Sequence, residues 1–497
     1  MDSQKTFDIR QRLWGCQANL FHLLVVAALL TLLMLGAREL WTQEGRWADI
    51  TWEMLVRGDY WHPYLDGFNY YDKPLLSYWA AVSLTWLTGI FNEWSLRFPS
   101  ALAGILSVWC VFRIGKRSAN PQVGLVAGWL MVSTFFVIYW SRVISADMLN
   151  VAGFLIAITW YFENRQRSDF WRYTVFFLLL ALASLLKGPV AMAIVAITIL
   201  PDFFMENRWR IHLNPRVILA LLPAIALYLT PFLYSHFHNP QHYGDSGLGK
   251  VYQENFLRYF QPFDHKEPFY VYLYYLPLYL LPWTLFFIPA CVDAVKRWHS
   301  LSDSARWAAL ATLLVFLFMT FSGSRRNYYT LMMVPFAILF TANWIVSDGV
   351  HTTRCRIAAW VCGVFIALYF LIFAIVMPIF AQHGPLHRLA ETVRHEASQL
   401  ASWDKWQLVM VHTNNKMGFY LKSAHPSTGI HGDNFAKEFP AFLKAHPHTI
   451  VITRTSALHH VKPALKGFKA IHEPANQLDQ WLGHKGGNDT WVFVPKH

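Results

Sequence analysis

Charged residues gather in one stretch of the chain, residues 41–79, between two strongly apolar runs. The stretch holds Glu44, Arg46, Asp72 and Lys73 among many aromatic residues. Ionisable groups beside a membrane carry a large desolvation cost, so they are usually kept for a function. Acids and bases in this position predict a binding or reaction site at the membrane surface.

Carboxylates could supply one part of this chemistry. Glu44 and Asp72 lie in the stretch, and Asp147 follows the segment Ser141-Arg-Val-Ile-Ser-Ala. A carboxylate in a partly dry cavity can remove a proton from an acceptor hydroxyl. Two simpler interpretations stay open, because Asp147 could cap the helix that begins there and Asp72 could form only a local ion pair with Lys73.

Cations could supply the other part. Basic side chains recur at the outer ends of apolar runs, at Arg46, Arg57, Lys73, Arg97, Arg142, Lys187, Arg258, Arg325 and Arg326. Arg and Lys bind phosphate oxygens through charge-assisted hydrogen bonds, so a converging set predicts a phosphate site. With the carboxylates, such a site would suit glycosyl transfer from a lipid phosphate. Singly, these side chains could merely extend to water, and the charges would also suit a lipid-phosphate transporter.

Membrane-spanning helices must position these residues. The chain has 497 residues, of which 55% are hydrophobic and 14% charged, and its mean hydropathy is +0.27. Apolar runs of roughly 17–22 residues without strand alternation predict a polytopic all-α transmembrane bundle and exclude a β-barrel. The net charge of +12 is explained by basic cytoplasmic loops, so we do not expect nucleic-acid binding.

Loop charges orient these runs. Basic loops fall on the cytoplasmic side if residues 75–91 lie flat on the membrane or re-enter it. The predicted spans are then residues 18–35, 98–114, 123–140, 148–162, a span ending near residue 186, 190–205, 217–234, 270–292, a span ending near residue 321, 331–346 and 357–380. This gives about eleven spans, or thirteen if two ambiguous segments also cross. We expect a cytoplasmic N-terminus on an uncleaved first span.

The outer loop, residues 42–96, and the C-terminal part complete the expected architecture. Residues 46–57 have helical periodicity and precede Gly58, which predicts an interfacial helix that ends there. From residue 381 polar residues become frequent, with an amphipathic helix at 391–403 and strands at 407–412, 449–453 and 491–494. We expect a transmembrane domain over residues 1–380 and a small α/β domain over residues 381–497, on the outer side.

A series of short motifs runs through residues 40–345. The motifs are Glu44-Gly-Arg46-Trp-Ala-Asp49-Ile, Glu53-Met54, Gly58-Asp59-Tyr60, Pro63, Gly67, Tyr71-Asp72-Lys73-Pro74, Tyr78-Trp79, Arg97-Phe-Pro99-Ser, Asp147, Lys187-Gly188-Pro189, Glu254-Asn255-Phe256-Leu257-Arg258-Tyr259, and Ser324-Arg325-Arg326-Asn327-Tyr328-Tyr329 before Pro335. In this order they resemble the bacterial aminoarabinose transferase and protein O-mannosyltransferase family. The resemblance implies a GT-C membrane glycosyltransferase that uses a polyprenyl phosphate sugar at the periplasmic face of the bacterial inner membrane.

The resemblance also implies roles for single residues. Lys73 and Arg258 look like contacts to the donor phosphate, with Arg46 beside them. Asp147 looks like the paired acidic residue of the second outer loop, and we expect it to be catalytic together with Glu44. The supporting residues would be Asp72, Tyr328, Tyr329, Arg326 and Lys187.

Gln43 departs from the family pattern, in which this loop begins Asp-Glu and the Asp is held to be central to catalysis. An amide cannot act as a general base. Three interpretations stay open. Glu44 takes the role, the acceptor is already an anion such as a phosphate on lipid A, or the chain binds the carrier lipid with altered or no catalysis.

The expected function is transfer of a sugar from undecaprenyl phosphate to lipid A, another envelope glycan or a protein. The alternative is a transporter or flippase for a lipid-linked sugar, which should carry charges on both faces and through its spans. Here the functional charges gather on one face. We expect no cofactor, and the spacing of the histidines favours no metal site, although some relatives in the wider class use a divalent ion.

Overall fold

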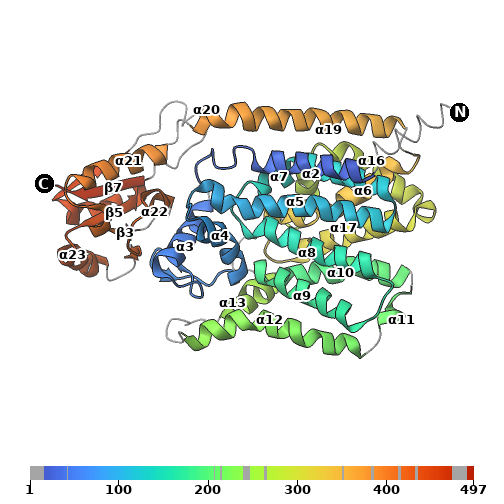
Figure 1. Cartoon of the computed structure of the whole chain (residues 1–497), viewed down its shortest axis with the longest axis horizontal. Coiled ribbons are helices and arrows are strands. Elements are labelled where there is room, and N and C mark those ends of the chain that lie inside the picture. Colours follow the sequence, from blue (N-terminus) through green and yellow to red (C-terminus); the bar gives the residue numbers. More distant parts are fainter. Residues whose placement is uncertain are drawn as a thin grey trace.

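The chain folds into a helical bundle with a small α/β domain at one end (Figure 1). The structure is a computed structural model, and it describes residues 16–41, 43–205, 207–212, 215–238, 247–261, 266–349, 352–381, 385–411, 416–430, 435–472 and 490–496. The α/β domain lies beside the loop that follows the first apolar helix, so two segments 347 residues apart in the chain meet there.

All eleven predicted spans are helical. The helices are α2 (Cys16–Leu32), α5 (Glu93–Ser118), α6 (Pro121–Ser133) with α7 (Phe135–Ser141), α8 (Ala146–Asn164), α9 (Phe170–Lys187), α10 (Val190–Met205), α12 (Arg216–His238), α15 (Val271–Tyr279) with α16 (Thr284–Lys296), α17 (Asp303–Phe321), α18 (Val334–Val346), and α19 (Thr353–Leu371) continuing through the π-helix η5 (Ile372–Val376) into α20 (Met377–Ala381). Short helices α11 (Trp209–His212), α13 (Gly247–Tyr252) and η3 (Trp298–Ser300) lie between them.

Two of the predicted spans are broken, which the hydropathy pattern did not reveal. Helices α6 and α7 are bent by 66° at Thr134, whose backbone is extended. Helices α15 and α16 are separated by a turn that includes Pro282, which has no N–H to continue the helix. Hydropathy averages over such breaks, so it predicted each pair as one continuous span.

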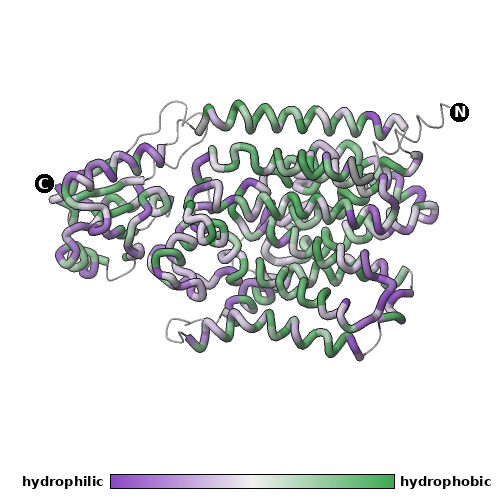
Figure 2. The backbone as a smooth tube through the Cα atoms, in the orientation of Figure 1, coloured by the Kyte–Doolittle hydropathy of each residue, from purple (hydrophilic) through white to green (hydrophobic). Residues whose placement is uncertain are grey.

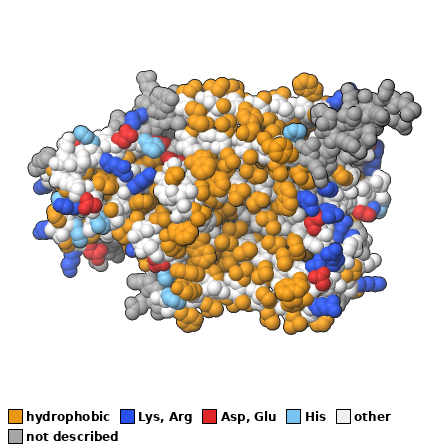
Figure 3. All heavy atoms as spheres, viewed as in Figure 1, with side chains coloured by type: hydrophobic (Ala, Val, Ile, Leu, Met, Phe, Trp, Pro, Cys, Tyr) orange, Lys and Arg blue, Asp and Glu red, His pale blue; other side chains and the backbone are white. Residues whose placement is uncertain are grey.

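Hydrophobic residues predominate along the middle of the bundle helices, and hydrophilic residues are frequent toward both ends of the bundle (Figure 2). Among the described residues five helices are long and apolar enough to cross a membrane, namely α5, α9, α12, α17 and α19 with its continuation, and the bent pair α6–α7 would be a sixth. Shorter apolar helices include α2, α10 and α18. Figure 3 shows the wide hydrophobic belt, with basic side chains gathered at the end that faces away from the α/β domain.

The loop between α2 and α5 is built from two helices and a hairpin. Helix α3 (Glu44–Arg57) ends at Gly58, whose φ of +66° suits glycine and confirms the predicted stop. Strands β1 (Tyr64–Leu65) and β2 (Phe68–Asn69) turn at Gly67 and lead to α4 (Leu75–Thr88), which lies against α3 and α5. Helix α4 is the ambiguous segment at residues 75–91, and it is helical but short.

The α/β domain contains a five-stranded sheet of order β4-β3-β5-β7-β6. Its strands are β3 (Gln407–Val411), β4 (Thr428–Gly429), β5 (Thr449–Arg454), β6 (Phe468–Ile471) and β7 (Thr490–Pro495), and its helices are α21 (Pro385–Ser398), η6 (Trp403–Lys405), α22 (Lys416–Leu421), α23 (Phe435–Ala445), η7 (Thr455–Ala457), α24 (Leu458–Val461) and η8 (Lys462–Leu465). The three predicted strands are confirmed as β3, β5 and β7. The sequence did not reveal β4 or β6, and the predicted helix at 391–403 begins and ends earlier, as α21.

Helix α3 is covered by the α/β domain on the side that carries its acidic residues Asp49 and Glu53. Asp49 and Glu53 are both fully buried, and the Ser427 N–H donates to Glu53 over 2.7 Å. A Cβ on Gly418 of α22 would lie 3.1 Å from the Asp49 carboxylate, so the two helices approach closely because this residue is glycine. The loop and the α/β domain therefore share one hydrophobic core.

Phe419 is expected to hold this junction together. It is 1% exposed and its ring centroid lies 5.0 Å from that of Phe91, which follows α4. Phe419→Leu should cost about 1 kcal/mol of stability and should speed amide hydrogen exchange across α3, because the ring contact to the loop is lost. Phe439→Leu is the matched control, since Phe439 is fully buried in the other core of the sheet. Equal exchange in α3 for both variants would contradict the shared core.

Candidate active site

A polar cavity of about 240 Å³ lies where the loop, the bundle and a short helical segment meet. Nine of the ten residues predicted for the site line it: Arg46, Asp72, Lys73, Asp147, Lys187, Arg258, Arg326, Tyr328 and Tyr329. They come from α3, the segment after β2, α8, α9, α14 (Arg258–Phe260) and the 3₁₀ helix η4 (Asn327–Met332) with its preceding residue. Cations distant in the sequence therefore converge on one space.

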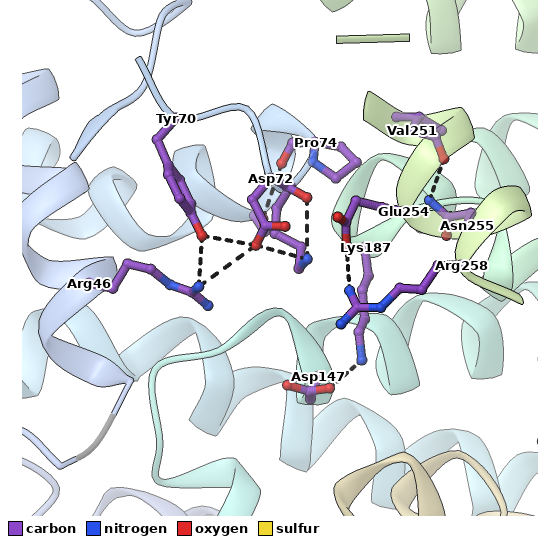
Figure 4. A network of polar contacts seen from close by, with 12 residues as sticks. Arg46, Tyr70, Asp72, Pro74, Asp147, Lys187, Val251, Glu254, Asn255 and Arg258 are labelled. Carbon is purple, nitrogen blue, oxygen red and sulfur yellow. Dashed lines mark hydrogen bonds and ion pairs between the residues drawn. The ribbon is translucent and has the colours of Figure 1, made fainter. Parts of the chain in front are cut away.

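Arg46 and Lys73 are held by a shared acceptor, the Asp72 carboxylate, which Figure 4 shows beside Arg46. Lys73 Nζ donates to the Asp72 carboxylate over 3.0 Å, and the Arg46 guanidinium lies 3.7 Å from the same oxygen. Tyr70 bridges Arg46 and Asp72, because Arg46 donates to the Tyr70 hydroxyl over 2.7 Å and that hydroxyl donates to Asp72 over 3.1 Å. Burial acts to raise the pKa of Asp72, but Lys73 and Arg46 outweigh it and hold the pKa below its usual value. The local ion pair considered for Asp72 is thus present and lies in the cavity wall.

Asp147 and Lys187 form an ion pair on the opposite wall (Figure 4). The N-cap of α8 is Ser145, whose hydroxyl accepts from the Asp147 N–H over 3.1 Å. Asp147 is therefore not the cap, and its carboxylate lies in the first turn of α8, facing the cavity. The Lys187 ammonium also lies 5.0 Å from the centre of the Tyr329 ring and 5.7 Å from that of Tyr328, within the range of cation–π attraction.

Arg258 and Arg326 complete the cationic lining. Arg258 pairs with Glu254 one turn earlier and donates to the Ser324 hydroxyl over 3.1 Å. Arg326 donates to the Tyr328 hydroxyl over 2.7 Å, and its buried Nε has no hydrogen-bond partner among the described residues. Glu254 lies in the π-helix η2 (Gln253–Leu257), which leads directly into α14.

The cavity carries an excess of positive charge. Five cations line it, and three carboxylates, Asp72, Asp147 and Glu254, oppose them, which leaves a surplus of two positive charges. Each of these carboxylates is already paired with a lysine or an arginine. Among the described residues no group of three or more acidic, histidine or cysteine side chains could hold a metal ion. The arrangement suits a phosphate group.

A second, mainly apolar cavity of about 300 Å³ adjoins the polar one. The two share Asp72, Lys73, Lys187, Glu254, Arg258 and Tyr329. The other walls are largely apolar, with Pro189, Val190, Phe256, Phe318 and Met319 among them. A ligand with a charged head and a hydrocarbon tail fits this combination, because the cations stand at the junction of the two spaces.

Glu44 does not line either cavity. It is fully buried and accepts hydrogen bonds from the Arg97 guanidinium at 2.8 and 2.9 Å and from the Arg38 guanidinium at 2.9 Å. It also accepts from the N–H groups of Trp41 and Ile144, at 2.8 and 3.0 Å. Burial would raise its pKa, but Arg38 and Arg97 lower it to about 2. Glu44 fastens α3 to the segment before α8, whereas its neighbour Gln43 reaches the polar cavity.

Two cavity residues, Tyr70 and Glu254, were not singled out from the sequence. Glu254 lies inside a motif that resembles the family and Tyr70 directly precedes one, but neither motif indicates which side chains face inward. The spacing of Glu254 and Arg258, four residues apart, was the available signal, since such pairs meet on one helix face. Tyr70 had no comparable signal, because its partner Arg46 is 24 residues away.

Glu44 gives a testable dependence of stability on pH. A carboxyl whose pKa falls from 4.5 to about 2 on folding contributes about 3 kcal/mol above pH 4.5, and this contribution is lost as the pH falls toward 2. Glu44→Gln should therefore lower the free energy of unfolding at pH 7, and the gap to the unmodified chain should shrink toward pH 3. Unfolding curves at both pH values measure this. A gap that does not change with pH would contradict the assignment.

Comparisons with known proteins point to one family. The family model described as dolichyl-phosphate-mannose-protein mannosyltransferase matches residues 72–234. An undecaprenyl phosphate-alpha-4-amino-4-deoxy-L-arabinose arabinosyl transferase of Edwardsiella ictaluri is 29% identical over 331 residues, which are 65% of this chain and 58% of that protein. The enzyme of the same name from Shewanella sediminis is 29% identical over 64% of this chain and 58% of its own length. The chain thus matches under two thirds of the length of these two relatives.

Solved structures show the same fold. ArnT from Cupriavidus metallidurans bound to undecaprenyl phosphate superposes with a TM-score of 0.71 at 16% identity, over 95% of this chain and 97% of that one. Its apo form gives a TM-score of 0.68 at 17% identity, with the same coverage. The GT-C fold with a small C-terminal sheet domain is therefore confirmed. Together the comparisons confirm the resemblance seen in the motifs: the chain is similar in sequence to the aminoarabinose transferases, matches the mannosyltransferase family model over residues 72–234, and shares the fold of ArnT.

Proposed function

We propose that the chain transfers a glycosyl group from undecaprenyl phosphate to lipid A or another envelope acceptor at the periplasmic face of the inner membrane. The observation that carries this proposal is the junction of the two cavities, where Lys73, Lys187 and Arg258 stand between a polar and an apolar space. The names of the sequence relatives and the carrier lipid in the similar solved structure support the same donor.

The donor phosphate would lie against Lys73 and Arg258, and its prenyl tail would occupy the apolar cavity. Arg46 adds a further positive charge beside Lys73. Its contacts with the Asp72 carboxylate and the Tyr70 hydroxyl hold its guanidinium in place. Such preorganised cations stabilise the charge that develops on a leaving phosphate. The sugar would then extend into the polar cavity, toward Gln43 and Tyr328.

In the proposed reaction an acceptor oxygen forms a bond to C1 of the sugar while the bond from C1 to the phosphate oxygen breaks. The electron pair of that bond leaves with the carrier phosphate. An acceptor phosphate, as on lipid A, is an anion at neutral pH, so no proton has to be removed and positioning suffices. For a hydroxyl acceptor, such as a glycan or protein, Asp147 is the carboxylate placed to take the proton.

Glu44 takes a different role in this proposal from the catalytic one expected from the sequence. Its acceptor positions are filled by Arg38, Arg97 and two backbone groups, and it lies outside the cavity lining. We assign it a positioning role, because it fixes Gln43 and Arg46 at the start of α3. Of the three interpretations of Gln43, the one that agrees best with this geometry is that the acceptor is already an anion, such as a phosphate on lipid A.

The orientation in the membrane follows from charge. Basic side chains, among them Arg113 and Arg117 around Glu163, gather at the end of the bundle away from the α/β domain. By the positive-inside rule this end would be cytoplasmic, and under this proposal the N-terminus would lie inside and the polar cavity and α/β domain in the periplasm.

Lys73→Ala tests the donor site. Turnover of an undecaprenyl phosphate sugar in reconstituted vesicles should fall by about 100-fold or more, because a preorganised charge at the leaving phosphate is lost. Arg297→Ala is the control, since Arg297 is 72% exposed at the distant end of the bundle. Full activity of Lys73→Ala would refute the phosphate role. Movement of the lipid-linked sugar across the vesicle membrane without transfer would instead support a transporter.

Gln43→Asp tests the acceptor. If the acceptor is an anion, a new carboxylate in the cavity should not raise kcat and should raise KM for the acceptor several-fold, because it reduces the positive surplus. Steady-state kinetics with lipid A as acceptor measure both constants, and Gln43→Asn controls for the change in side-chain length. A large gain in kcat would show that the native chain lacks a base.

A further inference from the structure

A third cavity, of about 500 Å³, lies between α8, α9, α10 and α12. Most of its lining is apolar, with Phe176, Phe177, Leu180 and Leu221 among the side chains. Arg172, in its wall, precedes Lys187 of the polar cavity by 15 residues on the same helix, α9. At 1.5 Å per residue the two positions are about 22 Å apart, so this cavity belongs to the other end of the bundle.

Arg172 carries a largely buried charge in the wall of this cavity. Its side chain is 9% exposed, its Nε donates to Asn164 over 3.2 Å, and a second nitrogen donates to the Asn164 carbonyl. Its Nη1 is buried and has no hydrogen-bond partner among the described residues. A buried guanidinium N–H without an acceptor is costly, so an acceptor is expected at this point.

The charge balance around this opening is positive. Asp202 forms ion pairs with Arg165 at 2.6 Å and with Arg208 at 3.1 Å. Asp169 lies 3.6 Å from Arg172, and its side chain is half exposed. Arg167 also lines the cavity, is exposed, and has no ion pair among the described residues. An anion would therefore meet Arg172 and Arg167 without displacing an existing carboxylate.

The cavity is open to the apolar surface of the bundle. Met192 and Ile225 belong to its lining and are 45% and 50% exposed. Trp171 and Phe204, close by in sequence to lining residues, are 73% and 67% exposed, as expected for aromatic side chains at a membrane interface. A hydrocarbon chain could enter from the side, and a headgroup would then lie at the level of the arginines.

We propose that this cavity binds an anionic glycerophospholipid, with one acyl chain inside and the phosphate on Arg172 and Arg167. The site is separate from the proposed donor site and shares no lining residue with it. The apolar walls select a lipid over free phosphate, and the two arginines select an anionic lipid over a zwitterionic one.

Native mass spectrometry of the full-length chain tests the proposal. Delipidated protein in detergent is titrated with phosphatidylglycerol or with phosphatidylcholine of the same chain length, and we expect tighter binding of the first. Arg172→Ala and Arg167→Ala should each weaken phosphatidylglycerol binding by about tenfold through loss of a charged hydrogen bond. Ala196→Trp should weaken the binding of both lipids, because Ala196 lines the cavity and a large side chain there would fill it. Arg297→Ala is the control and should bind as the unmodified chain does.

The outcomes separate the proposal from its rivals. Equal binding of the two lipids, or phosphatidylglycerol binding unchanged in Arg167→Ala and Ala196→Trp, would overturn it. These two variants decide the matter if Arg172→Ala fails to fold, since both residues are exposed. Displacement of phosphatidylglycerol by one equivalent of undecaprenyl phosphate would also overturn it, because the cavity would then be a second carrier site.

Discussion

The buried ion pair between Glu44 and Arg97 is the contact on which the polar cavity depends. Arg97, in α5, is 1% exposed and also donates to the carbonyl oxygens of Leu35, Arg38 and Glu39 in the connection from α2 to α3. One guanidinium thus fixes the entry of the loop, and through Glu44 it fixes the segment before α8. Removing one partner would leave an uncompensated buried charge, which is far more costly than removing both.

The rest of the site is positioned outward from this contact. Helix α3 starts at Glu44, so Gln43 and Arg46 face the cavity, while the buried face of the helix packs against α4 and the α/β domain. Asp147 follows Ile144 by three residues, so the hydrogen bond from Ile144 to Glu44 also sets the depth of Asp147. The α/β domain covers α3, so its acidic residues Asp49 and Glu53 lie against protein rather than water.

The sequence was informative where residue type is constrained by the membrane. Charged residues at the ends of apolar runs are few, so those with a family pattern were recognised, and the structure brings seven of them to one cavity. It was uninformative about partners. Glu44 was expected in the site because it carries a carboxylate. Its carboxylate instead forms a buried ion pair with Arg97, which lies 53 residues later in the chain. Similarly, nothing local in the sequence of α3 indicates that a domain encoded after residue 381 buries its acidic residues.

The positive surplus of the polar cavity has a kinetic consequence under the proposed function. The donor is a phosphodiester with one negative charge, and after transfer the carrier remains as a phosphate monoester with up to two. A pocket with two uncompensated cations therefore holds the carrier phosphate that remains after transfer more tightly than the sugar-bearing donor. The enzyme would then be slowed by departure of the carrier rather than by bond breakage, and a first rapid turnover would precede a slower steady state.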